Sequence, residues 1–269
     1  MEPGWQQVVL NSDQNQGKEL HTCSFTPEKE DRIVFCSDGI TQSGLGSKKH
    51  PFGWGREELA TFLVRETEKY PEISAAELSG RVVKKAVQND NFEPKDDTSC
   101  GVIYFREPRK MLICSGPPYE KDRDKIYAEK VKNFKGLKVL SGATTGDIIA
   151  REWGKEIEDT FDFDDPDLPP VSYMDGVDLI TEGILTLTKV SNILKEHNNK
   201  TVLGKGPADR IVKMILESDE IDFIIGKRIN IAHQDPTLPI ELEIRRTVIK
   251  RIAAILEEKF LKEVVIEFI

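Results

Sequence analysis

Apolar and polar positions follow two different periods in the first hundred residues of this chain. Short apolar runs rich in β-branched and aromatic residues predict strands at residues 6–10, 19–25, 33–36 and 98–105. Between the last two runs, apolar residues recur every three or four positions, which predicts two amphipathic helices. Leu59 and Phe62 belong to the first helix, and Leu78 and Val82 to the second. Ser74 followed by Glu77 is a capping-box pattern at the start of the second helix.

After a charged break at residues 106–110, strand-like runs alternate with helical patterns. The predicted strands cover residues 111–114, 137–140, 177–180, 221–225 and 264–268, and the predicted helices 122–134, 141–153, 185–196, 207–217 and 241–260. This alternation is typical of a parallel sheet with helices on both faces and right-handed connections. We therefore expect an α/β fold mixed with α+β, with one domain at residues 1–108 and a Rossmann-like α/β domain at residues 109–269.

Composition narrows the classes of function. The chain has 269 residues, enough for a sizeable core, and a formal net charge of −9. That charge argues against nonspecific nucleic-acid binding, which needs a basic face. No apolar run approaches the ~20 residues that span a bilayer, and the first residues lack a signal-peptide pattern. The four cysteines show no C-x-x-C spacing, so we expect buried reduced thiols in a cytoplasmic protein.

Two acidic motifs lie at predicted strand ends. Asp38 and Gly39 follow the strand at residues 33–36, and Asp96 and Asp97 precede the strand at residues 98–105. Carboxylates held at two strand ends suit Mg²⁺ or Mn²⁺, which prefer oxygen ligands. Each motif also has a plainer interpretation, because Asp-Gly is a common turn dipeptide and paired aspartates are common in solvated loops. A site with two metal ions would need a further bridging carboxylate.

These motifs resemble a known family. Residues 35–40 (Phe-Cys-Ser-Asp-Gly-Ile) and 96–102 (Asp-Asp-Thr-Ser-Cys-Gly-Val) resemble the last two metal-binding motifs of the metal-dependent type 2C protein phosphatases, above all the bacterial stage II sporulation protein E branch. The resemblance covers roughly residues 19–106. It implies part of a phosphatase β-sandwich with two helices, a phosphoserine or phosphothreonine substrate on a protein, and two Mn²⁺ or Mg²⁺ ions. Asp38 and Asp96 would be metal ligands, with Gly39 and Asp97 as their neighbours.

The chain departs from that family at its start. The family's Gly-Asp pair, whose carboxylate bridges the two metals, lies upstream of the last two motifs, and here only residues 1–32 precede the strand at residues 33–36. Asp13 lies in a polar loop without strand context. We therefore expect the C-terminal half of a phosphatase domain, with weak or absent activity alone. A second copy of the chain could cover its open strand edges, which makes a homo-oligomer plausible.

In the α/β domain, the carboxyl ends of the strands are the expected place for a ligand. Residues 142–146 offer free backbone N–H groups and two hydroxyls at a helix start, where an anion is favoured. The candidate ligand residues are Gly116, Gly142, Thr144, Thr145, Gly146, Glu182, Gly183 and His233. The alternative is a capped loop in which Thr144 or Thr145 is the N-cap. The loop is neither a Walker A motif nor a G-x-G-x-x-G fingerprint, so a mononucleotide or phosphometabolite remains a hypothesis.

Three further segments have plainer interpretations. His233, in the loop after the fourth strand, is expected to be a hydrogen-bonded loop histidine more often than a ligand. The acidic, proline-rich residues 161–170 could hold Ca²⁺, but they lack the glycine and terminal glutamate of an EF-hand, so a solvated connection is expected. Arg245 and Arg246 predict a solvent face for the helix at residues 241–260.

Two hypotheses of function follow. The first is a piece of a serine/threonine phosphatase with a regulatory partner or ligand. The second is a noncatalytic α/β module that binds a small anionic ligand or a partner and carries a structural phosphatase remnant. Residues 116–118, 142–145 and 182–186 are also similar to stretches in extensions of sporulation-phosphatase-like proteins found near iron hydrogenase genes. That resemblance implies no chemistry of its own.

Overall fold

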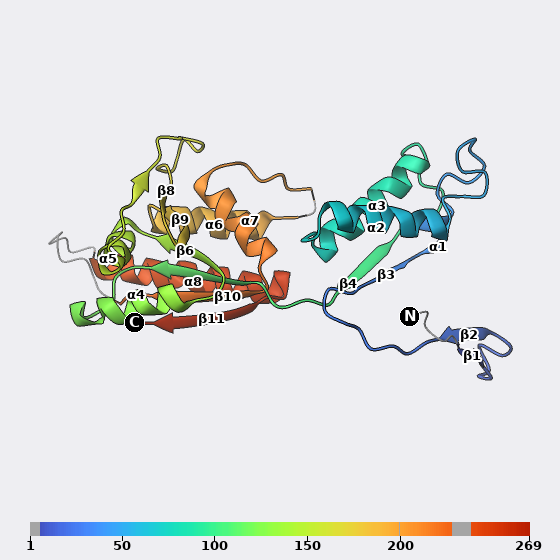
Figure 1. The fold of residues 1–269 in the computed structure, drawn as a ribbon, viewed down its shortest axis with the longest axis horizontal. Helices are drawn as coiled ribbons and strands as arrows, with labels where there is room; N and C mark the ends of the chain where they lie inside the picture. Colours follow the sequence, from blue (N-terminus) through green and yellow to red (C-terminus); the bar gives the residue numbers. More distant parts are fainter. Residues whose placement is uncertain (1–5, 199, 228–237) are drawn as a thin grey trace. The chain divides into compact units, whose positions relative to one another are not determined.

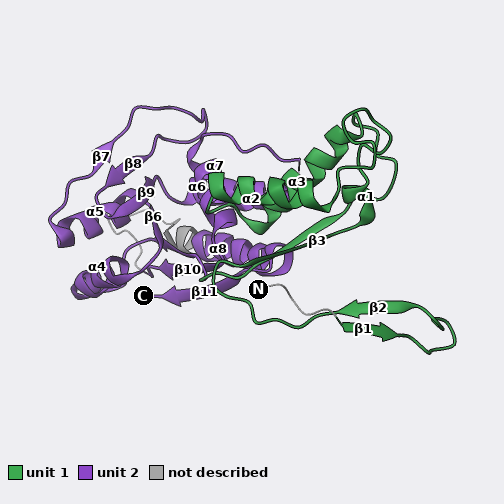
Figure 2. Cartoon of the chain, turned by 45° about the vertical axis from the view of Figure 1, so that its right-hand side comes forward, with its two compact units in different colours: residues 1–107 green, residues 108–269 purple. Residues whose placement is uncertain are grey.

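The computed structural model describes residues 6–198, 200–227 and 238–269 (Figure 1). The chain forms two compact units, Met1–Glu107 and Pro108–Ile269, which Figure 2 shows in separate colours. The division falls inside the charged break seen in the sequence. No helix in the described ranges has the length and apolar composition to cross a membrane.

Unit 1 contains, in its described residues, two separate pairs of antiparallel strands and three helices. The pairs are β1 (Gln6–Val9) with β2 (Glu19–Thr22), and β3 (Arg32–Cys36) with β4 (Cys100–Tyr104). The helices are α1 (Asp38–Thr41), α2 (Arg56–Lys69) and α3 (Ala75–Asn89). The predicted order of strands, two helices and a strand is therefore present. The Asp-Gly step, expected as a turn or loop, instead opens the short helix α1.

The core of unit 1 forms where α2 and α3 pack beside the β3–β4 pair. The capping pattern at α3 is confirmed, because the Ser74 hydroxyl accepts a hydrogen bond of 3.1 Å from the Glu77 N–H. Apolar residues at helical spacing then point to one side of α3. The buried residues of this core are Ile40, Trp54, Leu59, Val82 and Ala86.

Unit 2 is built on a seven-stranded sheet with the order β11-β10-β5-β6-β9-β8-β7 (Figure 1). The five parallel strands are β5 (Lys110–Ser115), β6 (Leu137–Ser141), β9 (Val177–Thr181), β10 (Glu220–Ile225) and β11 (Glu263–Phe268). The predicted α/β class and parallel sheet are therefore present. Two further strands, β7 (Glu158–Asp159) and β8 (Ser172–Met174), were not predicted and extend the sheet with antiparallel pairing.

Helices cover both faces of this sheet. The described helices are α4 (Asp124–Asn133), which the 3₁₀ turn η1 (Lys121–Arg123) precedes, α5 (Ala143–Trp153), α6 (Ile184–Glu196), α7 (Pro207–Glu217) and α8 (Leu238–Phe260). Alternate strand residues point to opposite faces. Leu112 and Leu140 pack with α4 and α5, whereas Ile113 and Phe223 pack with α6, α7 and α8.

The strand order is that of a doubly wound sheet. From β5 the chain moves outward to β6 and β9, and then crosses back to place β10 and β11 on the other side of β5. The direction of winding therefore reverses between β5 and β10. In open α/β sheets, ligands bind outside the carboxyl ends of the strands at such a reversal.

Candidate functional site

The two acidic motifs of unit 1 meet at one end of the β3–β4 pair. Cys36 and Cys100 are direct neighbours across the two strands. Beyond them, the Ser37 hydroxyl donates a 2.6 Å hydrogen bond to the Asp97 carbonyl and accepts one of 2.9 Å from the Ser99 N–H. The Ser37 N–H also donates to the Ser99 carbonyl at 3.0 Å. A single serine therefore ties the Ser-Asp-Gly motif to the Asp-Asp-Thr-Ser motif.

Gly39 is needed at this junction for a steric reason. A Cβ atom on this residue would lie 2.5 Å from the Asp97 carbonyl oxygen, which is closer than real Cβ atoms approach. The resemblance implies Gly39 as a neighbour of the metal ligands. In the structure, the backbone of the second motif lies in the space that a side chain would fill.

The carboxylates of the two motifs are held by local hydrogen bonds. Asp38 Oδ2 accepts from Gln42 Nε2 at 3.1 Å, and Asp96 Oδ1 accepts from the Asp97 N–H at 2.8 Å. Asp38, Asp96 and Asp97 are all exposed. Within the described residues, no group of three or more His, Cys, Asp or Glu side chains is arranged to hold a metal ion. A site with two carboxylates would leave Mg²⁺ most of its waters, as is common for this ion.

The neighbouring thiols have raised pKa values. Burial raises the pKa of Cys36, and it raises the pKa of Cys100 to about 11. A metal needs the thiolate form. All four cysteines of the chain are free, and Cys114 is buried whereas Cys23, Cys36 and Cys100 are half-buried.

In unit 2, the candidate loop at the start of α5 has a different geometry from the one expected. Gly142, with φ of 127°, is the N-cap residue, and no side chain caps the helix. The hydroxyl of Thr145 is buried and accepts a 2.9 Å hydrogen bond from the Gly116 N–H. The alternative interpretation, in which Thr144 or Thr145 caps α5, is therefore wrong. Thr145 lies inside the first turn, and its hydroxyl links that turn to the end of β5.

The ends of β6 and β9 also lie close together. The Ser141 hydroxyl donates a 3.1 Å hydrogen bond to the Gly183 carbonyl, and a Cβ on Gly183 would lie 3.4 Å from Gly142 Cα. The backbone between Thr181 and Gly183 therefore borders the N-terminus of α5, with Glu182 half-buried there. Gly146 has another role, because a Cβ on it would touch Ile180 and Ile157 at 3.3 Å. It allows α5 to pack closely on the sheet.

The guanidinium group of Arg245 lies at the end of β5, where the direction of winding reverses. A Cβ on Gly116 would lie 2.5 Å from Nη1 of Arg245, which belongs to α8, and 3.2 Å from the Gly226 carbonyl. Arg245 is half-buried. The predicted solvent face of this helix is therefore wrong at Arg245, which lies at the end of β5. Helical periodicity does not indicate which strand end a long side chain reaches, so this position could not be predicted.

Two buried hydroxyls near this edge lack partners. Thr181 and Thr186 are 4% and 1% exposed, and Oγ1 of each has no hydrogen-bond partner within the described residues. Buried polar groups usually have a partner or a water. His233 lies outside the described residues.

The acidic segment at residues 161–170 is anchored to helices. Asp165 is 5% exposed and accepts a 2.8 Å hydrogen bond from Lys189 of α6, while Asp164 pairs with Arg210 of α7 at 3.2 Å. The hydrogen bond from Lys189 holds the pKa of Asp165 below its usual value. The prediction of a solvated connection is therefore wrong at Asp165, which is buried and bound by Lys189, whereas Asp164 is exposed.

Comparison with protein-family models, curated proteins and solved structures found no match to this chain.

Proposed function

We propose that unit 1 is the C-terminal, metal-binding part of a Mn²⁺- or Mg²⁺-dependent protein serine/threonine phosphatase of the sporulation protein E type. The observation that carries this proposal is the Ser37 bridge, which joins the two motifs that resemble that family. The order of a strand, two helices and a strand supports it as well. Asp38 and Asp96 each provide a carboxylate to the ion.

Three neighbouring residues hold the two metal ligands in position. Gln42 orients the Asp38 carboxylate, the Asp97 N–H orients Asp96, and Ser37 fixes the spacing of the two backbones. A bound ion would polarise a phosphoryl oxygen and activate water. We propose weak turnover by this chain alone, because a second ion needs a bridging carboxylate. A partner polypeptide, including a second copy, could supply that group.

Mn²⁺ titration tests the ligand assignment. We expect Mn²⁺ to bind the purified chain and the Asp38→Asn and Asp96→Asn variants to bind it at least about tenfold more weakly, because each loses a charged ligand. Asp13→Asn is the matched control, since it makes the same charge change in an exposed turn. Unchanged Mn²⁺ binding in Asp38→Asn would contradict the proposal.

Hydrolysis of p-nitrophenyl phosphate with Mn²⁺ tests the proposed weak activity in the same proteins. We expect slow turnover that Asp38→Asn removes. Fast turnover that depends on Asp38 would support the metal site. It would contradict the proposal that a further bridging carboxylate is required.

A second function is favoured by the doubly wound sheet of unit 2. Its reversal between β5 and β10, the glycines at its strand ends and the position of Arg245 support a site for a mononucleotide or phosphometabolite. The N–H groups in the first turn of α5 would bind its phosphate. In this case unit 1 is a structural remnant or a surface for a regulatory partner.

Calorimetric titration of the full chain with a panel of nucleotides and sugar phosphates tests the second function. We expect Thr145→Val to weaken binding, because it releases the Gly116 N–H, and Asp38→Asn in the other unit to leave it unchanged. No binding across the panel would contradict this function and leave the first one standing.

A further inference from the structure

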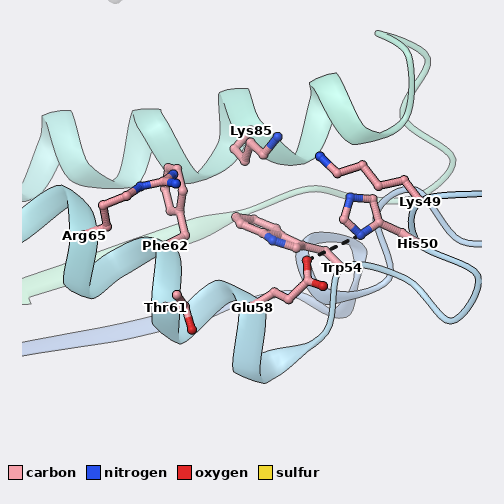
Figure 3. A pocket seen from close by; sticks show the side chains of 8 residues that line it. All are labelled: Lys49, His50, Trp54, Glu58, Thr61, Phe62, Arg65 and Lys85. Carbon is pink, nitrogen blue, oxygen red and sulfur yellow. Dashed lines mark ion pairs between the residues drawn. The ribbon is translucent and has the colours of Figure 1, made fainter.

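Unit 1 has a pocket of about 300 Å³ on the α2–α3 side of its core. Figure 3 shows the eight side chains that line it, from the loop after α1, from α2 and from α3. They are Lys49, His50, Trp54, Glu58, Thr61, Phe62, Arg65 and Lys85. A volume of this order is at the small end of the range for ligand sites. Neither acidic motif contributes a lining residue.

Positive charge dominates this pocket. Lys49, Arg65 and Lys85 are cationic, and Glu58 is the single carboxylate among the lining residues. The ammonium groups of Lys49 and Lys85 point toward one another across the pocket (Figure 3), and neither has an ion pair with a described residue. Two like charges that converge without a counter-charge repel each other. An anion between them would remove that repulsion.

His50 adds a buried group without a partner. The residue is 4% exposed, and its Nδ1 lies 3.5 Å from Oε2 of Glu58. Its Nε2 is buried and has no hydrogen-bond partner in the described part of the chain. A protonated imidazole donates from both nitrogens. Glu58 faces one nitrogen of His50, and in the protonated ring the other would be a donor on the side of the two lysines (Figure 3).

An aromatic wall closes the pocket from the core side. Trp54 is 4% exposed and meets Phe62 edge to face, with the ring centroids 5.4 Å apart. Arg65 lies over the Phe62 ring at 5.4 Å. Apolar walls lower the local dielectric constant and strengthen the attraction between a bound anion and the cations.

We propose that this pocket binds a phosphate monoester. Lys49, Lys85 and His50 approach as three separate donors, which suits a phosphate group with several acceptor oxygens better than a planar carboxylate. The aromatic wall would contact the organic part of the ester. The site uses neither Asp38 and Asp96 nor the strand ends of unit 2, so it does not depend on either proposed function.

Trp54 serves as a reporter for the test. The full chain with Trp5→Phe and Trp153→Phe keeps Trp54 as its one tryptophan, and its emission is followed during titration without metal at constant ionic strength. We expect a saturable change with inorganic phosphate and tighter binding of phenyl phosphate. Lys49→Gln and Lys85→Gln should each weaken binding about tenfold or more, the size of one lost charged hydrogen bond.

Two neighbouring lysines give matched controls. Lys48→Gln and Lys84→Gln make the same charge change one residue away from Lys49 and Lys85, at exposed positions that do not line the pocket. Both should bind phosphate as tightly as the parent chain. His50→Phe, which keeps an aromatic ring without nitrogens, should weaken binding, and the lysine variants decide the question if it does not fold. No saturable response, or equal weakening in Lys84→Gln and Lys85→Gln, would overturn the proposal.

Discussion

At the residue scale, Ser37 organises the acidic end of unit 1. Its hydroxyl bonds to the backbone of residues 60 and 62 positions later in the sequence. Composition and periodicity identify the aspartates and the glycine, because acidic residues at strand ends are visible locally. They cannot identify the serine, because its partners are known only once β3 and β4 are paired.

Replacement of Ser37 by alanine should destabilise unit 1 by about 1–2 kcal/mol, because the carbonyl of Asp97 and the N–H of Ser99 each lose a partner. The same change should weaken Mn²⁺ binding, since the spacing of the two motifs is no longer fixed. Urea unfolding followed by Trp54 emission measures the first effect.

Ser99→Ala is the control for that measurement. It removes a hydroxyl from the same motif, at an exposed position for which the described residues show no side-chain hydrogen bond. Equal destabilisation in the two variants would mean that the bridge has no special role.

For Thr145, the local sequence pattern suggests a role that the structure does not show. Threonine near a helix start suggests an N-cap, which a local pattern can indicate. In the structure Gly142 takes the cap position, and the Thr145 hydroxyl accepts from Gly116 of a neighbouring strand end. The local pattern failed because a tertiary partner 29 positions away competes for the same hydroxyl.

At the element scale, the pattern of apolar residues predicted the main helices and strands. The helix α3 was recognisable from its apolar spacing and its cap. The strands β5, β6 and β10 were recognisable from nearly continuous apolar runs that suit a buried parallel sheet. The two antiparallel strands β7 and β8 were not recognisable. They contain two and three residues, too few for a period to show.

The cap of α3 provides a test at this scale. Ser74→Ala should lower the stability of unit 1 by about 1 kcal/mol, because the Glu77 N–H loses its acceptor. Ser74→Asp should restore most of that stability, since aspartate is also a good N-cap and its charge suits the helix N-terminus. Thermal unfolding of the three proteins measures the difference. If Ser74→Asp is as unstable as Ser74→Ala, the cap is not the cause.

At the scale of the whole molecule, each unit has its own hydrophobic core. The described core clusters lie either within residues up to 107 or within residues from 108 onward. The sequence predicted a Rossmann-like second domain from alternating elements, but it could not predict that β10 returns beside β5. The position of β10 depends on contacts between segments about 110 positions apart. One of them is the 2.7 Å hydrogen bond that the Arg109 N–H donates to the Asp219 carboxylate.

We expect residues 108–269 to fold when expressed alone. The sheet and its two helical layers bury their apolar residues against one another, so the unit needs no apolar surface from elsewhere to complete its core. A cooperative urea transition of the fragment, followed by Trp153 emission, would match that of the full chain. A fragment that lacks such a transition would contradict the expectation.

Alkaline pH should destabilise unit 2 through its buried thiol. Burial raises the pKa of Cys114 from 9.0 to about 12, and it also raises the pKa of Tyr127 in the same cluster. The folded state keeps the proton that the unfolded chain releases. The contribution of Cys114 is therefore constant below pH 9 and is lost between pH 9 and about pH 12, at up to about 1.4 kcal/mol per pH unit.

The variant Cys114→Ala separates this thiol from other effects of high pH. It should lower stability at pH 7, because a buried side chain is shortened, yet lose less stability than the parent chain between pH 9 and pH 11. Cys23→Ala changes a thiol in the other unit and should leave the pH dependence of the Trp153 signal unchanged. If Cys114→Ala loses stability as steeply as the parent chain, another group controls unfolding at alkaline pH. Tyr127 would then be the first group to examine.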